Sequence, residues 1–174
     1  MLCGSSPNVI LVALGSNLAG AWGSPRETIL RALEELDLNG IRLVRASPVI
    51  LTAPFGRRNQ PAYLNAVAAI ETHLPPEALM RRLHTIEHKA GRRRRVRWGP
   101  RTLDLDLIDY RGLIRDAKDK GPILPHPGVA QRAFVLQPIA AIAPRWRHPA
   151  NRLSAREMLR RLGGTREGRI LVST

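Results

Sequence analysis

The most constraining feature of this chain is a strict alternation of leucine and aspartate, Leu103-Asp104-Leu105-Asp106-Leu107. Successive side chains of a β-strand point to opposite sides, so a period of two predicts a strand with one apolar face. The three leucines are expected to face the hydrophobic core, and both carboxylates to share the other side. Taken alone, such a pair of acids is more often the solvated side of a half-buried strand than a binding site.

The residues before this strand favour a binding site. Two nearby carboxylates repel each other unless a cation lies between them, and Mg²⁺ is often held by one or two carboxylates together with substrate phosphates. Six arginines precede the pair within residues 91–101. Guanidinium groups bind phosphate oxygens bidentately. The segment therefore predicts a phosphoryl-transfer site, with Gly91 and Gly99 at the ends of a loop that closes over its ligand.

The positive charge of the chain is unevenly distributed. The formal net charge is +14, yet residues 1–55 hold four arginines and four acids, so the whole excess belongs to residues 56–174. This asymmetry indicates an anionic partner, although arginines scattered over a solvated surface would give the same total. No G-x-x-x-x-G-K-[ST] segment is present, which excludes a P-loop enzyme.

Composition predicts a globular cytoplasmic protein. A length of 174 residues with 44% hydrophobic residues is typical of one domain, expected to span residues 1–174. Cys3 is the one cysteine, which fits a reducing compartment. No apolar run approaches the roughly 18 residues that span a bilayer. The short run Val9–Leu14 has no basic region before it, so it is expected to be a buried strand rather than a signal peptide.

Local signals predict the order of helices and strands. Ser24 and Glu27 form a capping box at the start of a first helix that Asn39-Gly40 ends, and Pro75-Pro76 opens a second helix. The predicted elements are a strand at 8–14, a helix at 24–40, strands within 41–52 interrupted at Pro48, a strand at 63–71, a helix at 75–91 and a strand at about 103–110. This β-α-β-β-α-β order predicts a ferredoxin-like α+β sandwich with an antiparallel sheet.

Extra helices are expected towards the C-terminus. Residues 111–130 are polar and punctuated by proline and glycine, which predicts a loop. A helix at 131–142 follows, with a break or kink expected at Pro138. Ser154 and Glu157 form a second capping box and predict a last, basic helix.

The segment Trp98-Gly-Pro-Arg-Thr-Leu-Asp-Leu-Asp106 closely resembles the signature of the 6-hydroxymethyl-7,8-dihydropterin pyrophosphokinase family. The nine-residue signature is highly specific. Other stretches fit the same family in the same order: Ala13-Leu-Gly-Ser-Asn17, Gln60-Pro-Ala-Tyr-Leu-Asn65, Glu87 through Gly91-Arg92, Leu124-Pro-His126 and Arg132-Ala-Phe134. The resemblance covers roughly residues 8–145. The basic tail, residues 146–174, matches little, and its arginines receive no role.

This resemblance implies the ferredoxin-like fold and the reaction. The family transfers the β,γ-pyrophosphoryl group of ATP to the hydroxymethyl oxygen of the pterin and releases AMP, in folate biosynthesis. It implies two Mg²⁺ ions held by Asp104 and Asp106, with Arg92 and Arg101 acting on the triphosphate from mobile loops. These four residues are the predicted catalytic set. The expected partners are ATP and the pterin, with no membrane and no required nucleic acid, and the chain is expected to be a monomer.

Two groups of substrate-binding residues follow from the resemblance. Tyr63 and Phe134 are expected to sandwich the pterin ring, a geometry that suits aromatic stacking. Asn65 would read the polar edge of the ring. The remaining pterin contacts are assigned to Thr52, Pro54 and Phe55. The predicted ATP contacts are His84, Glu87, Arg92, Arg94, Trp98, Arg101, His126 and Arg132. The chain departs from the family at Ala53, where proline is common, at His84, where glutamine is common, and in an arginine loop one residue shorter than in some relatives.

Two other classes of function fit parts of the sequence. His84-Thr-Ile-Glu-His88 matches the H-x-x-E-H pattern of zinc hydrolases, although a five-residue match is weak and leaves the aspartate pair unexplained. A basic RNA-binding α+β module is the other alternative, since RNA-binding sheets carry exposed aromatic residues. Against it, only 4% of the residues are aromatic.

Overall fold

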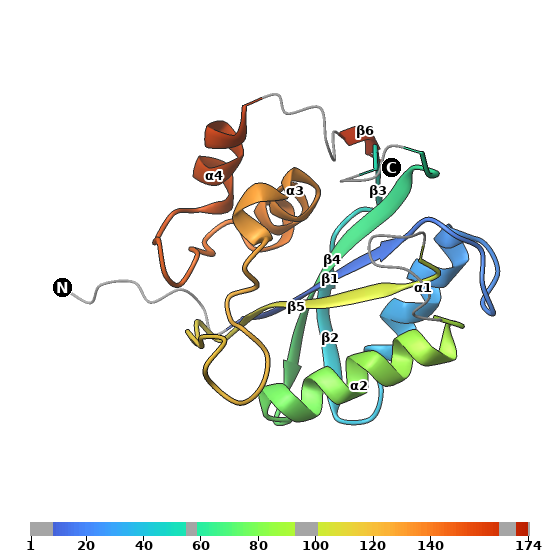
Figure 1. Cartoon of the computed structure of the whole chain (residues 1–174), viewed down its shortest axis with the longest axis horizontal. Coiled ribbons are helices and arrows are strands. Elements are labelled where there is room, and N and C mark those ends of the chain that lie inside the picture. The colour runs from blue at the N-terminus through green and yellow to red at the C-terminus, as the bar shows by residue number, and fades with distance from the viewer. Residues whose placement is uncertain (1–8, 55–58, 93–100, 164–169, 174) are drawn as a thin grey trace.

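β1 (Ile10–Ser16) is buried along its whole length and is flanked on both sides by antiparallel neighbours. The computed structural model describes residues 9–54, 59–92, 101–163 and 170–173. Within them a six-stranded antiparallel sheet lies between two layers of helices (Figure 1). The other elements of the predicted fold are α1 (Pro25–Glu35), β2 (Ile41–Ala46), β3 (Ile50–Thr52), β4 (Tyr63–Thr72), α2 (Pro76–Lys89) and β5 (Asp104–Tyr110).

The strand order confirms the predicted α+β fold. The path through the sheet is β5-β1-β4-β3-β6, and β2 also pairs with β4. Taken as β5-β1-β4-β2, this is the arrangement that a β-α-β-β-α-β chain adopts when each crossover helix returns over the same face. The expected interruption at Pro48 separates β2 from β3.

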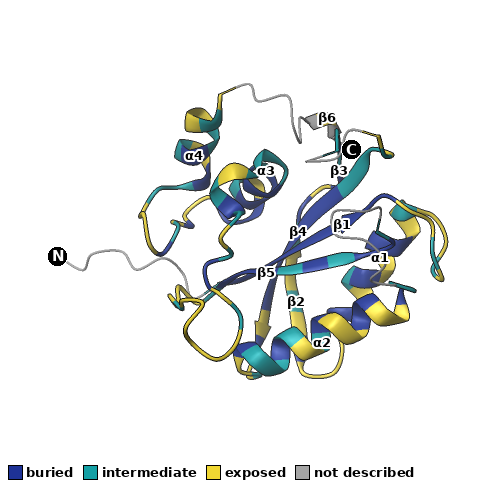
Figure 2. Cartoon of the chain, viewed as in Figure 1, coloured by how far each residue is buried: buried dark blue, intermediate teal, exposed yellow. Residues whose placement is uncertain are grey.

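The two faces of the sheet carry separate cores. One face packs against α1 and α2 and includes Val12, Leu14, Ala68 and Ile70. Leu103, Leu105 and Leu107 belong to this core, with exposures of 0%, 2% and 3%, as the alternation predicts. The other face, including Leu11 and Val67, packs against α3 (Ala133–Ile142) and α4 (Ala155–Leu162), as Figure 2 shows.

The C-terminal part corrects the sequence prediction at two points. The sequence predicts a break or a kink at Pro138; α3 contains this residue and continues to Ile142, so the helix is not broken there. The buried packing of α3 outweighs the hydrogen bond that proline lacks. β6 (Ile170–Ser173), which the sequence did not predict, pairs antiparallel with β3. The loop before α3 contains a single 3₁₀ turn, Val129–Gln131, and both predicted capping boxes are present.

The basic tail begins inside the core. Trp146 is 1% exposed, and its Nε1–H donates to Asp109 Oδ2 at 2.6 Å. The other carboxylate oxygen of Asp109 accepts the N–H of Gly112 at 2.7 Å. Burial raises the pKa of Asp109. Ala155 and Met158 of α4 are buried beneath the same layer, so this part of the tail completes the fold. No helix of the described residues has the length and apolar character to cross a membrane.

The bond between Trp146 and Asp109 is therefore expected to stabilise the fold. Trp146→Phe leaves a buried carboxylate with one donor fewer and should lower the free energy of unfolding by about 1–3 kcal/mol. Urea unfolding at pH 7 measures this, with Trp22→Phe, the same change at a partly buried position in the other core, as control. Equal stability of Trp146→Phe and the wild type at pH 7 would contradict the assignment.

Candidate active site

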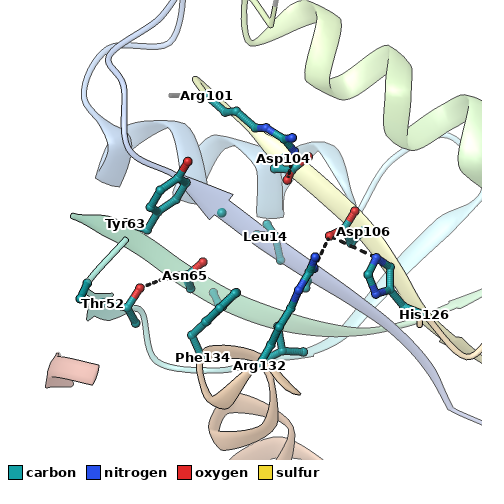
Figure 3. A pocket seen from close by; sticks show the side chains of 15 residues that line it. Leu14, Thr52, Tyr63, Asn65, Arg101, Asp104, Asp106, His126, Arg132 and Phe134 are labelled. Atoms are coloured by element: carbon teal, nitrogen blue, oxygen red, sulfur yellow. Dashed lines mark hydrogen bonds and ion pairs between the residues drawn. The ribbon is translucent and has the colours of Figure 1, made fainter. Parts of the chain in front are cut away.

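A cavity of about 210 Å³ opens between the ends of β1, β3, β4 and β5 and the first turn of α3. Figure 3 shows the side chains that line it. Nine of the predicted site residues are among them: Thr52, Tyr63, Asn65, Arg101, Asp104, Asp106, His126, Arg132 and Phe134. Residues separated by more than 80 positions in the sequence are thus brought to one wall by the antiparallel register.

Asp104 and Asp106 lie side by side on β5 and both face the cavity. Their register partners on β1 are Gly15 and Ala13, whose small side chains leave the carboxylates accessible. The side chains of Asp104 and Asp106 are 24% and 32% exposed. The prediction that both carboxylates point to the same side is confirmed.

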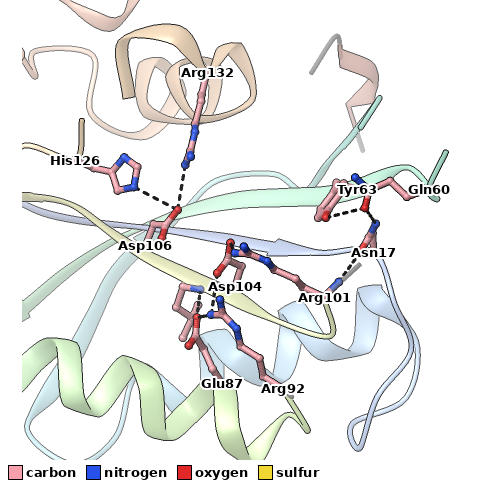
Figure 4. Close-up of polar contacts among 11 residues, drawn as sticks. Asn17, Gln60, Tyr63, Glu87, Arg92, Arg101, Asp104, Asp106, His126 and Arg132 are labelled. Atoms are coloured by element: carbon pink, nitrogen blue, oxygen red, sulfur yellow. Dashed lines mark hydrogen bonds and ion pairs between the residues drawn. The ribbon is translucent and has the colours of Figure 1, made fainter. Parts of the chain in front are cut away.

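Cationic side chains from three segments compensate these two charges (Figure 4). Arg92, just after α2, places Nη1 2.8 Å from Asp104 Oδ1, and Arg101, just before β5, pairs with Asp104 Oδ2. Arg132, just before α3, places Nη1 3.1 Å from Asp106 Oδ2. The carboxylates are thus held among groups that bind phosphate, as the arginine-rich sequence predicts.

His126 stands beside the second carboxylate with its ring orientation set by the backbone. Its Nδ1 accepts the N–H of Gly128 at 3.0 Å, so a neutral ring carries its proton on Nε2. That nitrogen faces Asp106 Oδ2 at 3.7 Å. Burial lowers the pKa of His126, against the opposing influence of Asp106. At neutral pH this histidine is therefore a neutral donor directed at the site.

Glu87 holds the arginine side of the site from α2. Its side chain is 3% exposed, accepts the backbone N–H of Leu105 at 2.8 Å, and pairs with Arg92. Desolvation raises the pKa of Glu87 to about 7, although the N–H of Leu105 and the charge of Arg92 act in the opposite direction. Glu87 and Asp104 together grip Arg92 at the edge of β5.

Aromatic and amide groups form the other end of the cavity. Tyr63 and Phe134 enter it from β4 and α3, with Asn65 and Thr52 near them (Figure 3). Asn65 Nδ2 donates to Thr52 Oγ1 at 2.8 Å, and both residues are buried. A Cβ on Gly15 would lie 3.1 Å from Asn65 Oδ1, so the backbone of β1 passes close to this amide. This end suits a flat ring with polar edges.

Some predicted residues lie elsewhere. His84 is exposed on α2, and Pro54 follows β3; neither lines the cavity. Phe55, Arg94 and Trp98 lie outside the described residues, so their predicted contacts stay predictions. The sequence reading assigned no role to Gln60 or Asn17, which contact Tyr63 and Arg101 respectively. Asn17 could have been noticed, because it lies in the recognised segment Ala13–Asn17.

The donor set fits magnesium better than zinc. Two partly exposed carboxylates offer hard oxygen ligands and leave room for phosphate. The H-x-x-E-H alternative is not supported, because His84 and His88 are exposed while Glu87 is buried against β5. Within the described ranges no three histidine, cysteine, aspartate or glutamate residues gather as a metal site. The RNA-binding alternative is not supported either, since α3 and α4 cover the sheet face opposite α1 and α2.

Comparison with known proteins agrees with this geometry. Residues 11–144 match the family model described as 7,8-dihydro-6-hydroxymethylpterin-pyrophosphokinase (HPPK). A Pseudomonas aeruginosa 2-amino-4-hydroxy-6-hydroxymethyldihydropteridine pyrophosphokinase is 44% identical over 144 residues, which cover 82% of this chain and 85% of that protein. A protein of the same name from Methylorubrum extorquens is 41% identical over 134 residues, or 76% and 81% of the two chains.

A solved structure supports the fold. A Plasmodium falciparum HPPK-DHPS triple mutant superposes with a TM-score of 0.67 at 10% identity, over 88% of this chain. The chain corresponds to 43% of that longer protein, and the likeness concerns the fold alone.

The raised pKa of Glu87 makes stability depend on pH. A carboxyl whose folded pKa of about 7 exceeds its unfolded value of 4.5 holds its proton more tightly in the folded state. Its stabilising contribution is therefore complete below pH 4.5 and is lost as the pH rises to about 7. Glu87→Gln, which mimics the protonated form, should gain up to about 3 kcal/mol relative to the wild type across this range.

Urea unfolding at several pH values measures the difference. Glu34→Gln, at an exposed position on α1, serves as control and is expected to follow the wild type. A constant difference in the free energy of unfolding between Glu87→Gln and the wild type across this pH range would show that folding does not raise the pKa of Glu87.

Proposed function

This chain belongs to the 7,8-dihydro-6-hydroxymethylpterin-pyrophosphokinase family, and from that premise we propose how its residues divide the work of the reaction. It is a transferase of folate biosynthesis: it moves the pyrophosphoryl group of ATP to 6-hydroxymethyl-7,8-dihydropterin and releases AMP. The observation that carries the proposal is one cavity in which a carboxylate pair, matched by arginines, adjoins an aromatic end with buried amides.

The phosphate end is the part around Asp104 and Asp106. Their carboxylates hold the metal, and the guanidiniums of Arg92, Arg101 and Arg132 take up the triphosphate oxygens. In the ligand-free chain these guanidiniums and the carboxylates neutralise one another. With metal and nucleotide bound, the carboxylates would pair with the metal and the guanidiniums with phosphate oxygens, so that neither set of charges would be left uncompensated. His126 and Glu87 position the groups on the two sides of the carboxylate pair.

The pterin end is the part around Tyr63 and Phe134. The two rings hold the flat pterin, while Asn65 and Thr52 offer buried hydrogen-bonding groups to its polar edge. Buried amides discriminate strongly against a ring that leaves them unpaired. The pterin contacts of Pro54 and Phe55 and the nucleotide contacts of His84, Arg94 and Trp98, which the family resemblance implies, stay predictions.

The reaction is an in-line displacement. The hydroxymethyl oxygen of the pterin forms a bond to the β-phosphorus, the bond from that phosphorus to the oxygen bridging to the α-phosphorus breaks, and AMP leaves while the hydroxyl proton is released. Arg92 and Arg101 stabilise the charge that develops on the phosphate oxygens. When bound, Mg²⁺ supplies further neutralisation of that charge.

We also propose the number of metal ions, the oligomeric state, the extent of the domain and the location of the protein. We propose two Mg²⁺ ions, as the family resemblance implies, which Asp104 and Asp106 would hold together with the substrate phosphates. The monomer predicted from the sequence stays a proposal. One domain over residues 1–174 is supported by the packing of α3 and α4 on the same sheet as α1 and α2. A cytoplasmic location fits the single cysteine.

Identification of the nucleotide product tests the function. The purified chain is incubated with 6-hydroxymethyl-7,8-dihydropterin, ATP and Mg²⁺, and the nucleotides are separated by chromatography. AMP is expected in amounts equal to the pyrophosphorylated pterin, because the β,γ unit is transferred whole. Formation of ADP, or no turnover, would refute the proposed reaction.

The carboxylate pair is tested separately. Asp104→Ala and Asp106→Ala should each lower kcat by at least about 100-fold, because the electrostatic contacts at the transferring group are lost. Circular dichroism and thermal unfolding should show folded proteins. Asp116→Ala, at an exposed position in the loop after β5, is the matched control and should turn over as the wild type does. Near-normal activity of either Asp104→Ala or Asp106→Ala would refute the metal assignment.

A further inference from the structure

Asn17 is a buried amide at the end of the central strand that the proposed reaction does not use. It follows β1 directly, and only 4% of its surface is exposed. It belongs to the family-like segment Ala13–Asn17, but the sequence alone predicts no role for its side chain. A buried amide without hydrogen-bond partners lowers the stability of the fold. The partners of Asn17 therefore indicate its role.

The backbone N–H and the side-chain oxygen of Asn17 hold Arg101 at the phosphate end. The backbone N–H of Asn17 donates to the carbonyl oxygen of Arg101 at 3.1 Å, and Oδ1 of Asn17 accepts the N–H of Arg101 at 2.9 Å. Arg101 is therefore held at both its N–H and its carbonyl, as a partner in a β-ladder would be. Its guanidinium then pairs with Asp104.

The side-chain nitrogen of Asn17 contacts the residues before Tyr63 at the pterin end. Nδ2 of Asn17 donates to the carbonyl oxygen of Pro61 at 3.1 Å and lies 3.4 Å from Oε1 of Gln60. That oxygen also accepts the hydroxyl of Tyr63 at 3.3 Å. Figure 4 shows this chain of contacts from Arg101 through Asn17 and Gln60 to Tyr63.

The neighbours of Asn17 show why the link falls at this position. Gly15 still pairs with Asp104 on one side and with Asn65 on the other within the regular sheet. One residue on, Ser16 Oγ donates to the carbonyl of Thr102 at 2.5 Å. Asn17 is the point where the backbone ladders of the central strand have ended, and its side chain continues both of them. An asparagine amide can do this because it has an acceptor and a donor of the same kind as a peptide group.

We propose that Asn17 is a positioning residue that couples the two substrate sites: its amide fixes Arg101 relative to residues 60–63, so that occupation of the phosphate end tightens the pterin end. The inference rests on the proposed function, because it assigns ATP and pterin to these two ends. Asn17 does not line the cavity, so it acts through Arg101 and Tyr63 and not by touching substrate.

Two substitutions separate the halves of the amide. Asn17→Asp has the same shape and keeps the oxygen that accepts the N–H of Arg101, but loses the donor to Pro61. Asn17→Ala loses both. Asn17→Asp should raise KM for the pterin about tenfold with kcat near the wild-type value, as expected for the loss of one or two hydrogen bonds. Asn17→Ala should also lower kcat by about 10- to 100-fold, because Arg101 is no longer held in place.

The decisive readout is the coupling between ligands. Calorimetry gives the affinity for 6-hydroxymethyl-7,8-dihydropterin with and without saturating α,β-methylene-ATP and Mg²⁺, and the ratio of the two affinities is the coupling factor. The wild type should show a factor well above one, and both Asn17 variants should move it towards one. Leu18→Ala, at an exposed neighbouring side chain, is the matched control and should keep the wild-type factor.

Each outcome supports or overturns the proposal. A coupling factor of one in the wild type, or an unchanged coupling factor in folded Asn17→Asp, would overturn it. An equal fall in the pterin affinity with and without the nucleotide, as a general loss of structure gives, would overturn it too. If neither Asn17 variant folds, Gln60→Ala carries the test, because it removes the shared acceptor of Asn17 and Tyr63; an unchanged factor there overturns the proposal. A wild type that releases no AMP would instead refute the proposed function, so the two failures are distinguishable.

Discussion

Charge compensation around Asp104 and Asp106 is the interaction on which the candidate site depends. The two carboxylates are only partly exposed and stand on a strand whose other face is hydrophobic core. Two neighbouring carboxylates repel each other, and nearby cations offset that repulsion. Arginines that follow α2, precede β5 and precede α3 supply this compensation, so three remote segments converge on one strand. A site built in this way already contains both the ligands for a metal and the donors for phosphate.

The same antiparallel sheet places the aromatic end of the cavity next to the carboxylate pair. β1 lies between β5 with the carboxylates and β4 with Tyr63 and Asn65. The small residues Ala13 and Gly15 on β1 leave space between these neighbours, and α3 contributes Phe134 from above. The carboxylates of β5 and the aromatic and amide groups of β4 therefore lie on the two sides of a single strand, with two strand spacings of about 5 Å each between their backbones.

Two buried carboxylates outside the cavity are also paired with donors. Asp109 is satisfied by Trp146 and Gly112, and Glu87 by Leu105 and Arg92. The contact of Asp109 with Trp146 joins β5 to the basic tail, and the contact of Glu87 with Leu105 joins β5 to α2. β5 is thus tied to both helical layers by carboxylates as well as by its leucines. At the end of the central strand, Asn17 joins Arg101, which precedes β5, to Pro61, which precedes β4.

Short-range patterns in the sequence determined much of this protein. The leucine–aspartate alternation predicted which face of β5 is core, the two capping boxes located the starts of α1 and α4, and the nine-residue signature identified the family. These signals act within a few residues, where the backbone geometry of strands and helix ends applies whatever the rest of the chain does.

The tertiary structure decided the features whose partners are remote. α3 continues through Pro138 because its packing outweighs a local penalty, and β6 forms because β3 offers it an edge. His84 and Glu87 lie only three residues apart, yet α2 exposes the first and buries the second against Leu105. The side-chain partners of Asn17, Pro61 and Arg101, precede β4 and β5 and are remote from it in the sequence. A side chain's hydrogen-bond partners depend on which strands become neighbours, and only the completed sheet defines them.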